Sequence, residues 1–134
     1  MSEIASDISI HVTPEYEAEQ SVPEQQRYVF SYHIRISNRS QARVQLLTRH
    51  WLITDGDGKI QEVQGEGVIG ETPVIEPGAD YHYSSGAVLK TEVGSMQGHY
   101  GMKCVDPNAQ AAEQDDMFEA NIPVFTLAVP SALH

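Results

Sequence analysis

The chain has 134 residues and a mass of 14.8 kDa, which is enough to bury one independent hydrophobic core. Eight Lys and Arg residues against nineteen Asp and Glu residues give a formal net charge of −11, which argues against direct binding to nucleic-acid phosphates or to an anionic membrane surface. A hydrophobic content of 40% is ordinary for a globular protein and argues against wholesale disorder. We therefore expect one acidic domain that spans residues 1–134.

Cysteine usage and the N-terminal segment indicate the cellular compartment. Cys104 is the single cysteine, so no disulfide can form within the chain. The first residues have neither the basic region nor the apolar region of a secretory signal, and no apolar run approaches the roughly 20 residues of a membrane helix. These features predict a cytoplasmic protein whose thiol stays reduced.

An alternation of apolar and polar residues with a period of two dominates the chain and predicts β-strands. In segment 44–54, Val44 and Leu46 point to one side and Trp51 to the other, so either both faces are covered or a bulge switches the apolar face. Residues 55–58 read Asp-Gly-Asp-Gly and predict a tight hairpin turn. In chain order, we expect strands over residues 8–14, 28–37, 44–54, 59–64, 81–83, 96–104 and 118–128, and a long surface loop over 65–78 with room for one short strand.

Helical patterns are nearly absent from the chain. Residues 109–112 are rich in alanine, but so short a stretch supports one or two turns at most. Seven or eight strands separated by turns predict an all-β sandwich of the immunoglobulin or fibronectin type III class. Large apolar residues at alternating positions are expected in or near its core, namely Phe30, Tyr32, Ile34, Trp51, Tyr100 and Phe125.

Residues 65–70, Gly-Glu-Gly-Val-Ile-Gly, match the glycine fingerprint of dinucleotide-binding folds and the glycine spacing of a phosphate-binding P-loop. Both mechanisms need a helix that begins within the motif, whereas Pro73 and Pro77 follow it here. Glu71 also occupies the place of the P-loop lysine, so a phosphate would be repelled unless a metal or a distant arginine compensated. We therefore interpret the glycines as residues that allow positive φ and close backbone approach.

The six histidines raise the alternative of a metal site, although no two of them have the i, i+2 or i, i+4 spacing of paired ligands. His33, His50 and His99 fall on expected strands and could meet on one sheet face. Cys104 alternates with apolar neighbours and is expected to be a small core residue. The G-x-S-x-G and H-E-x-x-H motifs are missing from the sequence, so we expect no catalytic residue and no cofactor, with a divalent metal as the one alternative.

A combined pattern extends over most of the chain and is more specific than the glycine string alone. It consists of residues 49–55, 62–70 and 83–86, of Gly58, Pro73, Pro77, Gly78, Leu89, Thr91, Gly94, Met96, Gly98 and Tyr100, and of the ending Phe118, Ile122, Pro123, Phe125 and Leu127. This pattern closely resembles the ApaG family, also called CorD in bacteria. The sequence departs from the family at Thr72, where glutamine is usual, and in the acidic loop 106–116, which looks longer than typical.

The resemblance implies a fibronectin type III-like sandwich and supplies no catalytic residue. In bacteria the family is associated with cobalt tolerance and magnesium efflux, and its gene often neighbours a diadenosine tetraphosphate hydrolase. In eukaryotes a similar domain occurs in F-box proteins and in a polymerase-interacting protein, where it looks like a protein-binding module. The resemblance therefore implies a non-catalytic interaction module, with a nucleotide-, pyrophosphate- or divalent-metal-binding protein as the alternative.

The Gly65–Pro77 loop is the candidate site for a protein partner. Loops that join rigid strands commonly carry recognition residues, and the anionic charge of this loop favours a protein partner over a phosphate. Its four apolar residues at positions 68, 69, 74 and 75 either all anchor the loop or leave an exposed patch ringed by carboxylates. The sequence identifies neither the partner nor the oligomeric state. The candidate binding residues are Gly65, Glu66, Gly67, Val68, Ile69, Gly70 and Glu71.

Overall fold

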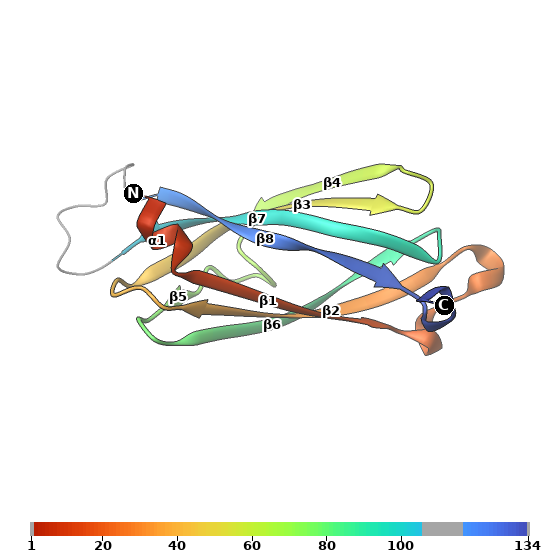
Figure 1. Ribbon diagram of the computed structural model, residues 1–134, viewed down its shortest axis with the longest axis horizontal. Coiled ribbons are helices and arrows are strands. Elements are labelled where there is room, and N and C mark those ends of the chain that lie inside the picture. Colours follow the sequence, from red (N-terminus) through yellow and green to blue (C-terminus); the bar gives the residue numbers. More distant parts are fainter. Residues whose placement is uncertain (1, 106–116, 134) are drawn as a thin grey trace.

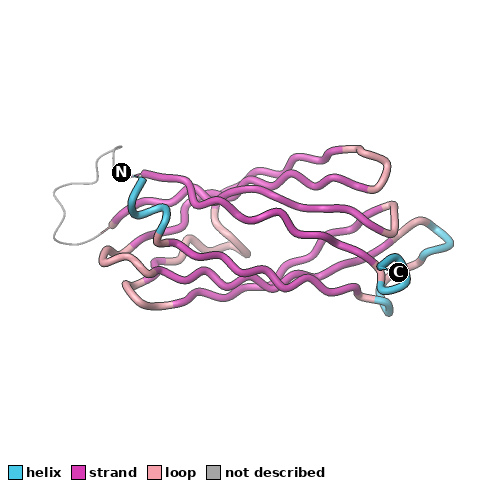
Figure 2. Tube along the Cα trace, viewed as in Figure 1, coloured by secondary structure: helices cyan, strands magenta, loops and turns pink. Residues whose placement is uncertain are grey.

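The computed structural model describes residues 2–105 and 117–133, and these are mostly β-strand (Figures 1 and 2). The expected acidic loop and the alanine-rich turn within it lie outside the described residues. Short helical segments are α1 (Ser2–Ser6), η1 (Ala18–Gln20), η2 (Pro23–Gln25) and η4 (Pro130–Leu133). The strands are β1 (Ile8–Tyr16), β2 (Tyr28–Asn38), β3 (Val44–Asp55), β4 (Ile60–Glu66), β5 (Val74–Ile75), β6 (Asp80–Leu89), β7 (Val93–Cys104) and β8 (Met117–Ala128).

Two antiparallel sheets form the molecule, which confirms the predicted all-β sandwich (Figure 1). One sheet has the strand order β1-β2-β6, and the other has the order β4-β3-β7-β8. The short strand β5 pairs with the beginning of β3. Strand β1 packs beside β8, which closes the sandwich on that side. Strands β4 and β6 are therefore the terminal strands of their sheets on the opposite, open side.

Some strands are longer than the sequence pattern predicts. Strand β6 covers ten residues, because it pairs with β2 along its whole length, including the Ser84-Ser85-Gly86 stretch that has little strand preference of its own. Strand β4 reaches Glu66, so Gly65 and Glu66 pair with β3 and do not begin the loop. The sequence pattern does not predict α1, because five residues are too few to show a helical period.

A β-bulge in β3 decides which side chains face the core. The pairing of β3 with β7 shifts register between Leu46 and Thr48. Val44 and Leu46 are buried before the bulge, and Trp51 is buried after it. The extra residue therefore moves the inward positions from even to odd numbers, which is the second of the two alternatives that the sequence leaves open.

The core lies between the two sheets and contains the predicted residues. Phe30, Tyr32, Ile34, Trp51 and Tyr100 are buried, while Phe125 is half-buried and packs against them. Trp51 makes edge-on ring contacts with three of these aromatic side chains. The expectation that Cys104 is a core residue is wrong, because that side chain is only half-buried at the end of β7.

Candidate functional site

A cleft of about 280 Å³ opens between the two sheets on the side of β4 and β6. Both sheets contribute to it, and the turn after β4 covers one end. Most of the residues that line it are apolar or aromatic, and the polar side chains among them carry one guanidinium and a few hydroxyls, a composition typical of binding clefts. The lining residues are Tyr32, Arg49, Trp51, Ile53, Val63, Val68, Ile69, Tyr83, Ser85, Gly86 and Met96.

The glycine motif forms the turn that covers this cleft. Val68 and Glu71 bond to each other through both backbone N–H groups, at 2.8 and 2.9 Å, and the two residues between them have positive φ. Positive φ at both central positions is the pattern of a type I′ hairpin turn. Gly67 also has positive φ, and a Cβ there would lie 2.2 Å from the Glu71 carbonyl oxygen. These glycines thus have structural reasons to be glycine.

Arg49 lies beneath this turn and ties it to β3. Its Nη1 group donates hydrogen bonds to the carbonyl oxygens of Glu66 (3.0 Å) and Gly67 (2.9 Å). A Cβ on Gly65 would lie 2.8 Å from the Nη2 atom of the same guanidinium. The first glycine of the motif therefore makes room for an arginine side chain.

The apolar residues of the loop divide into two buried and two exposed side chains. Val68 and Ile75 are buried and anchor the loop on the sandwich. Ile69 is 61% exposed and Val74 is 46% exposed. The alternative in which all four are buried is therefore wrong.

Carboxylates flank these exposed side chains in the sequence. Glu66, Glu71 and Glu76 are all exposed. The Tyr81 hydroxyl donates a hydrogen bond to the Glu71 carboxylate at 3.2 Å, and burial together with this carboxylate raises the pKa of Tyr81. Arg43 forms an ion pair with Glu76 at 2.9 Å.

Three tyrosines place hydroxyl groups between the sheets. The Tyr83 and Tyr100 hydroxyls form a hydrogen bond in the core, one from each sheet. Burial raises the pKa of both. Burial also raises the pKa of Tyr32, against the opposing effects of a hydrogen bond with Ser85 and of the charge on Arg49. All three tyrosines are therefore neutral hydrogen-bonding groups near pH 7.

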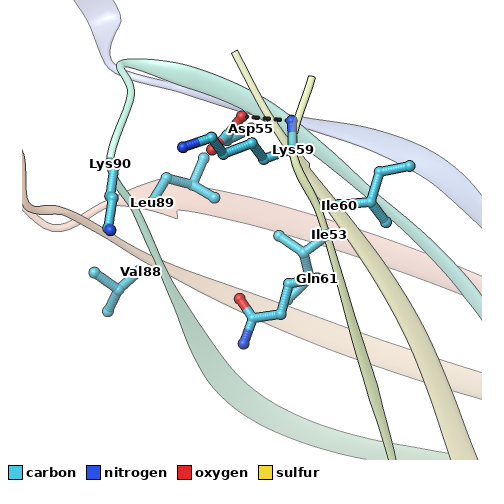
Figure 3. A pocket seen from close by; sticks show the side chains of 8 residues that line it. All are labelled: Ile53, Asp55, Lys59, Ile60, Gln61, Val88, Leu89 and Lys90. Carbon is cyan, nitrogen blue, oxygen red and sulfur yellow. Dashed lines mark hydrogen bonds between the residues drawn. The ribbon is translucent and has the colours of Figure 1, made fainter. Parts of the chain in front are cut away.

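A second hollow, of about 190 Å³, continues from the cleft toward the β3–β4 hairpin, and Ile53 lines both (Figure 3). Lys59, Lys90 and Asp55 are the charged residues that line it (Figure 3). That carboxylate accepts hydrogen bonds from the backbone N–H groups of Asp57 (2.9 Å) and Lys59 (3.0 Å). Asp55 thus stabilises the predicted hairpin turn.

The histidines meet only in part as the sequence suggests. His50 and His99 stack on β3 and β7, with ring centroids 4.9 Å apart, and they pair with Glu62 and Glu119 respectively. The hydrogen bond from His50 lowers the pKa of Glu62. His33 lies in the other sheet, so the alternative in which all three histidines meet on one sheet face does not occur. Within residues 2–105 and 117–133, no three His, Cys, Asp or Glu side chains are arranged to hold a metal ion.

The predicted site residues, from Gly65 to Glu71, are contiguous in the structure at the end of β4 and the turn after it. The site predicted from the sequence does not include Tyr32, Arg49 or Ser85, which also line the cleft. A signal for Arg49 was present, because it alternates with Trp51 and therefore points to the same side of β3. For Ser85 no such signal exists, because its place on the cleft follows from the pairing with Tyr32.

No helix of the described residues is long and apolar enough to cross a membrane. The sandwich and its cleft define the chain as a small β-module suited to binding interactions. It belongs to the ApaG family, because the family model for the ApaG domain matches residues 18–104.

Individual relatives agree with this assignment. Protein ApaG from Pseudomonas paraeruginosa is 52% identical over 134 residues, covering 100% of both chains. Protein ApaG from Aromatoleum aromaticum is 50% identical over 127 residues, covering 95% of this chain and 94% of that one. A crystal structure of an ApaA protein from Bordetella pertussis superposes with a TM-score of 0.82 at 42% identity, covering 92% of this chain and 94% of that one.

Proposed function

We propose that this protein is a non-catalytic, cytoplasmic interaction module that binds a protein partner through the Gly65–Pro77 loop. The observation that carries this proposal is the side chain of Ile69, which is 61% exposed at a φ of +43°. A β-branched residue rarely adopts positive φ, and burial does not compensate for the strain here. Strained residues that persist in folded proteins cluster at binding and switch regions.

The surroundings of Ile69 also support a protein interface. Val74 adds a second exposed aliphatic side chain, and Glu66 and Glu71 are exposed nearby in the sequence. Apolar residues with a polar rim are the usual composition of protein-binding patches. The association of the family with cobalt tolerance and magnesium efflux makes proteins of cobalt and magnesium homeostasis the first partners to test.

Replacing Ile69 with asparagine is expected to raise stability while weakening capture of the partner. Asparagine tolerates the left-handed conformation better, so relief of the strain should stabilise the fold by about 1 kcal/mol. The melting temperature should rise by about 3–5 °C. Calorimetry measures the change in stability, and quantitative pull-down from the native cytosol measures capture of the partner.

Val124→Asn is the control, because that side chain is 63% exposed on β8. Capture of the partner by this variant should be unchanged. A stabilised Ile69 variant with normal capture would contradict the proposal.

The double variant Glu66→Gln and Glu71→Gln should weaken capture without lowering the melting temperature. Glutamine keeps the acceptor for the Tyr81 hydroxyl but removes two charges that would attract a basic partner surface. Capture by the unchanged protein should also decrease as salt screens this attraction. Glu24→Gln with Glu92→Gln removes the same charge from exposed positions outside the loop. Equal capture by both double variants would locate the interface elsewhere.

The alternative of a nucleotide or pyrophosphate site at the glycine motif has less support. Phosphates bind glycine loops through free backbone N–H groups. The N–H groups of Gly67, Val68 and Glu71 already donate to carbonyl oxygens of Leu47, Glu71 and Val68. Arg49 is the compensating arginine that the sequence argument requires, but two of its hydrogen bonds are directed to loop carbonyls.

A further inference from the structure

The guanidinium of Arg49 has unused binding capacity in the cleft. Its Nη1 group donates hydrogen bonds to the two loop carbonyls, whereas Nε and Nη2 have no hydrogen-bond partner among the described residues. No carboxylate of residues 2–105 and 117–133 forms an ion pair with Arg49. A guanidinium with Nε and Nη2 available presents the parallel donors that grip a carboxylate with two hydrogen bonds.

The walls around Arg49 suit an apolar body attached to such a carboxylate. Tyr32, Trp51, Val63 and Met96 supply aromatic and aliphatic surface between the sheets. Ser85 is exposed on the opposite wall and adds a hydroxyl. Apolar walls with a few convergent polar groups are the usual architecture of a small-molecule site.

Charge decides between a carboxylate and a phosphate. Arg49 is the one cation among the residues that line this cleft, in a chain with a net charge of −11. A single guanidinium balances a single negative charge. A phosphate dianion would leave one negative charge unbalanced in a chain that is already strongly anionic.

We propose that this cleft is a binding site for an organic monocarboxylate with an aromatic or aliphatic body, in which Arg49 binds the carboxylate. The proposal stands apart from partner binding and does not depend on it.

Phenylacetate and its uncharged counterpart phenylacetamide test this proposal at constant ionic strength. Trp51 is the only tryptophan of the chain and lines the cleft, so its fluorescence and indole N–H resonance report binding directly. We expect phenylacetate to bind with a Kd on the order of 1 mM or lower, at least about tenfold tighter than the amide. Equal affinities, or no response to phenylacetate at ~20 mM, well above that range, would overturn the proposal.

Variants of the cleft identify the residue responsible. Arg49→Gln should reduce the affinity for phenylacetate to that for the amide, and Arg49→Lys should retain part of the preference. Ser85→Glu places a carboxylate in the cleft while leaving Arg49 and its loop bonds in place, and it should abolish binding even if Arg49→Gln fails to fold. Arg39→Gln is the matched control, because that arginine is exposed and does not line the cleft. A folded Arg49→Gln or Ser85→Glu variant that keeps the preference would overturn the proposal.

The carboxylate could belong to a free acid or to a peptide C-terminus, and a second arm distinguishes these sources. A pentapeptide ending in phenylalanine is titrated with a free and with an amidated terminus. If the free-terminus peptide binds more tightly than phenylacetate, the ligand is a chain terminus. If it binds more weakly, the ligand is a free acid.

Discussion

Replacing Trp51 with alanine is expected to lower the free energy of unfolding by about 3–5 kcal/mol. The indole is 3% exposed, and its ring centroid lies 5.5 Å from that of Tyr32 and 5.9 Å from that of Phe125. Removing it would leave a cavity between the sheets that these neighbours can fill only in part. Urea denaturation followed by circular dichroism measures the loss, since the variant has no tryptophan fluorescence.

The matched control for this variant is Ile60→Ala. Ile60 is large and apolar but 66% exposed at the start of β4, so its truncation should change stability by less than about 0.5 kcal/mol. Stability of the Trp51 variant close to that of the unchanged protein would show that the indole does not hold the sheets together.

Replacing Gly98 with alanine is expected to destabilise the protein by about 3 kcal/mol. A Cβ at this position would lie 2.0 Å from the carbonyl oxygen of His50 on the neighbouring strand. The obstacle is backbone within the β3–β7 pair, so it cannot move aside as a flexible side chain would. The midpoint of urea denaturation measures the effect.

Gly58→Ala separates this clash from the general cost of losing a glycine. Gly58 has a φ of +84°, and a Cβ there would meet no atom within 4 Å. Its replacement should cost only about 1 kcal/mol, the price of left-handed backbone. A smaller loss at Gly98 than at Gly58 would contradict the role assigned to the β3–β7 contact.

The sequence was sufficient for the fold because the strands carry strong alternation. Phe30, Tyr32 and Ile34 show a period of two, and all three are buried. The sequence predicts the ends of strands less accurately where pairing with a neighbouring strand outweighs local strand preference. The Ser84-Ser85-Gly86 stretch is a strand only because β2 lies beside it.

The site was predictable only where it is contiguous in the sequence. The glycine motif predicts positive φ in this segment. It does not predict the φ of Ile69 or the exposure of its side chain, because both depend on the hairpin geometry and on the packing of Val68. The cleft combines side chains from both sheets. Its assembly follows from strand order, which a single sequence with several equivalent strands does not specify.

The extra residue in β3 has a consequence for how relatives of this protein can differ in length. Removing one residue between Leu46 and Thr48 would restore regular pairing and leave Arg49 and Trp51 facing inward, because each would keep its present partner on β7. Removing two residues would instead turn Arg49 and Trp51 to the outer face and His50 inward. An alignment gap of one residue at this point is therefore compatible with an intact inter-sheet cleft, whereas a gap of two residues marks a homologue in which the cleft has been lost, even where every motif letter is retained.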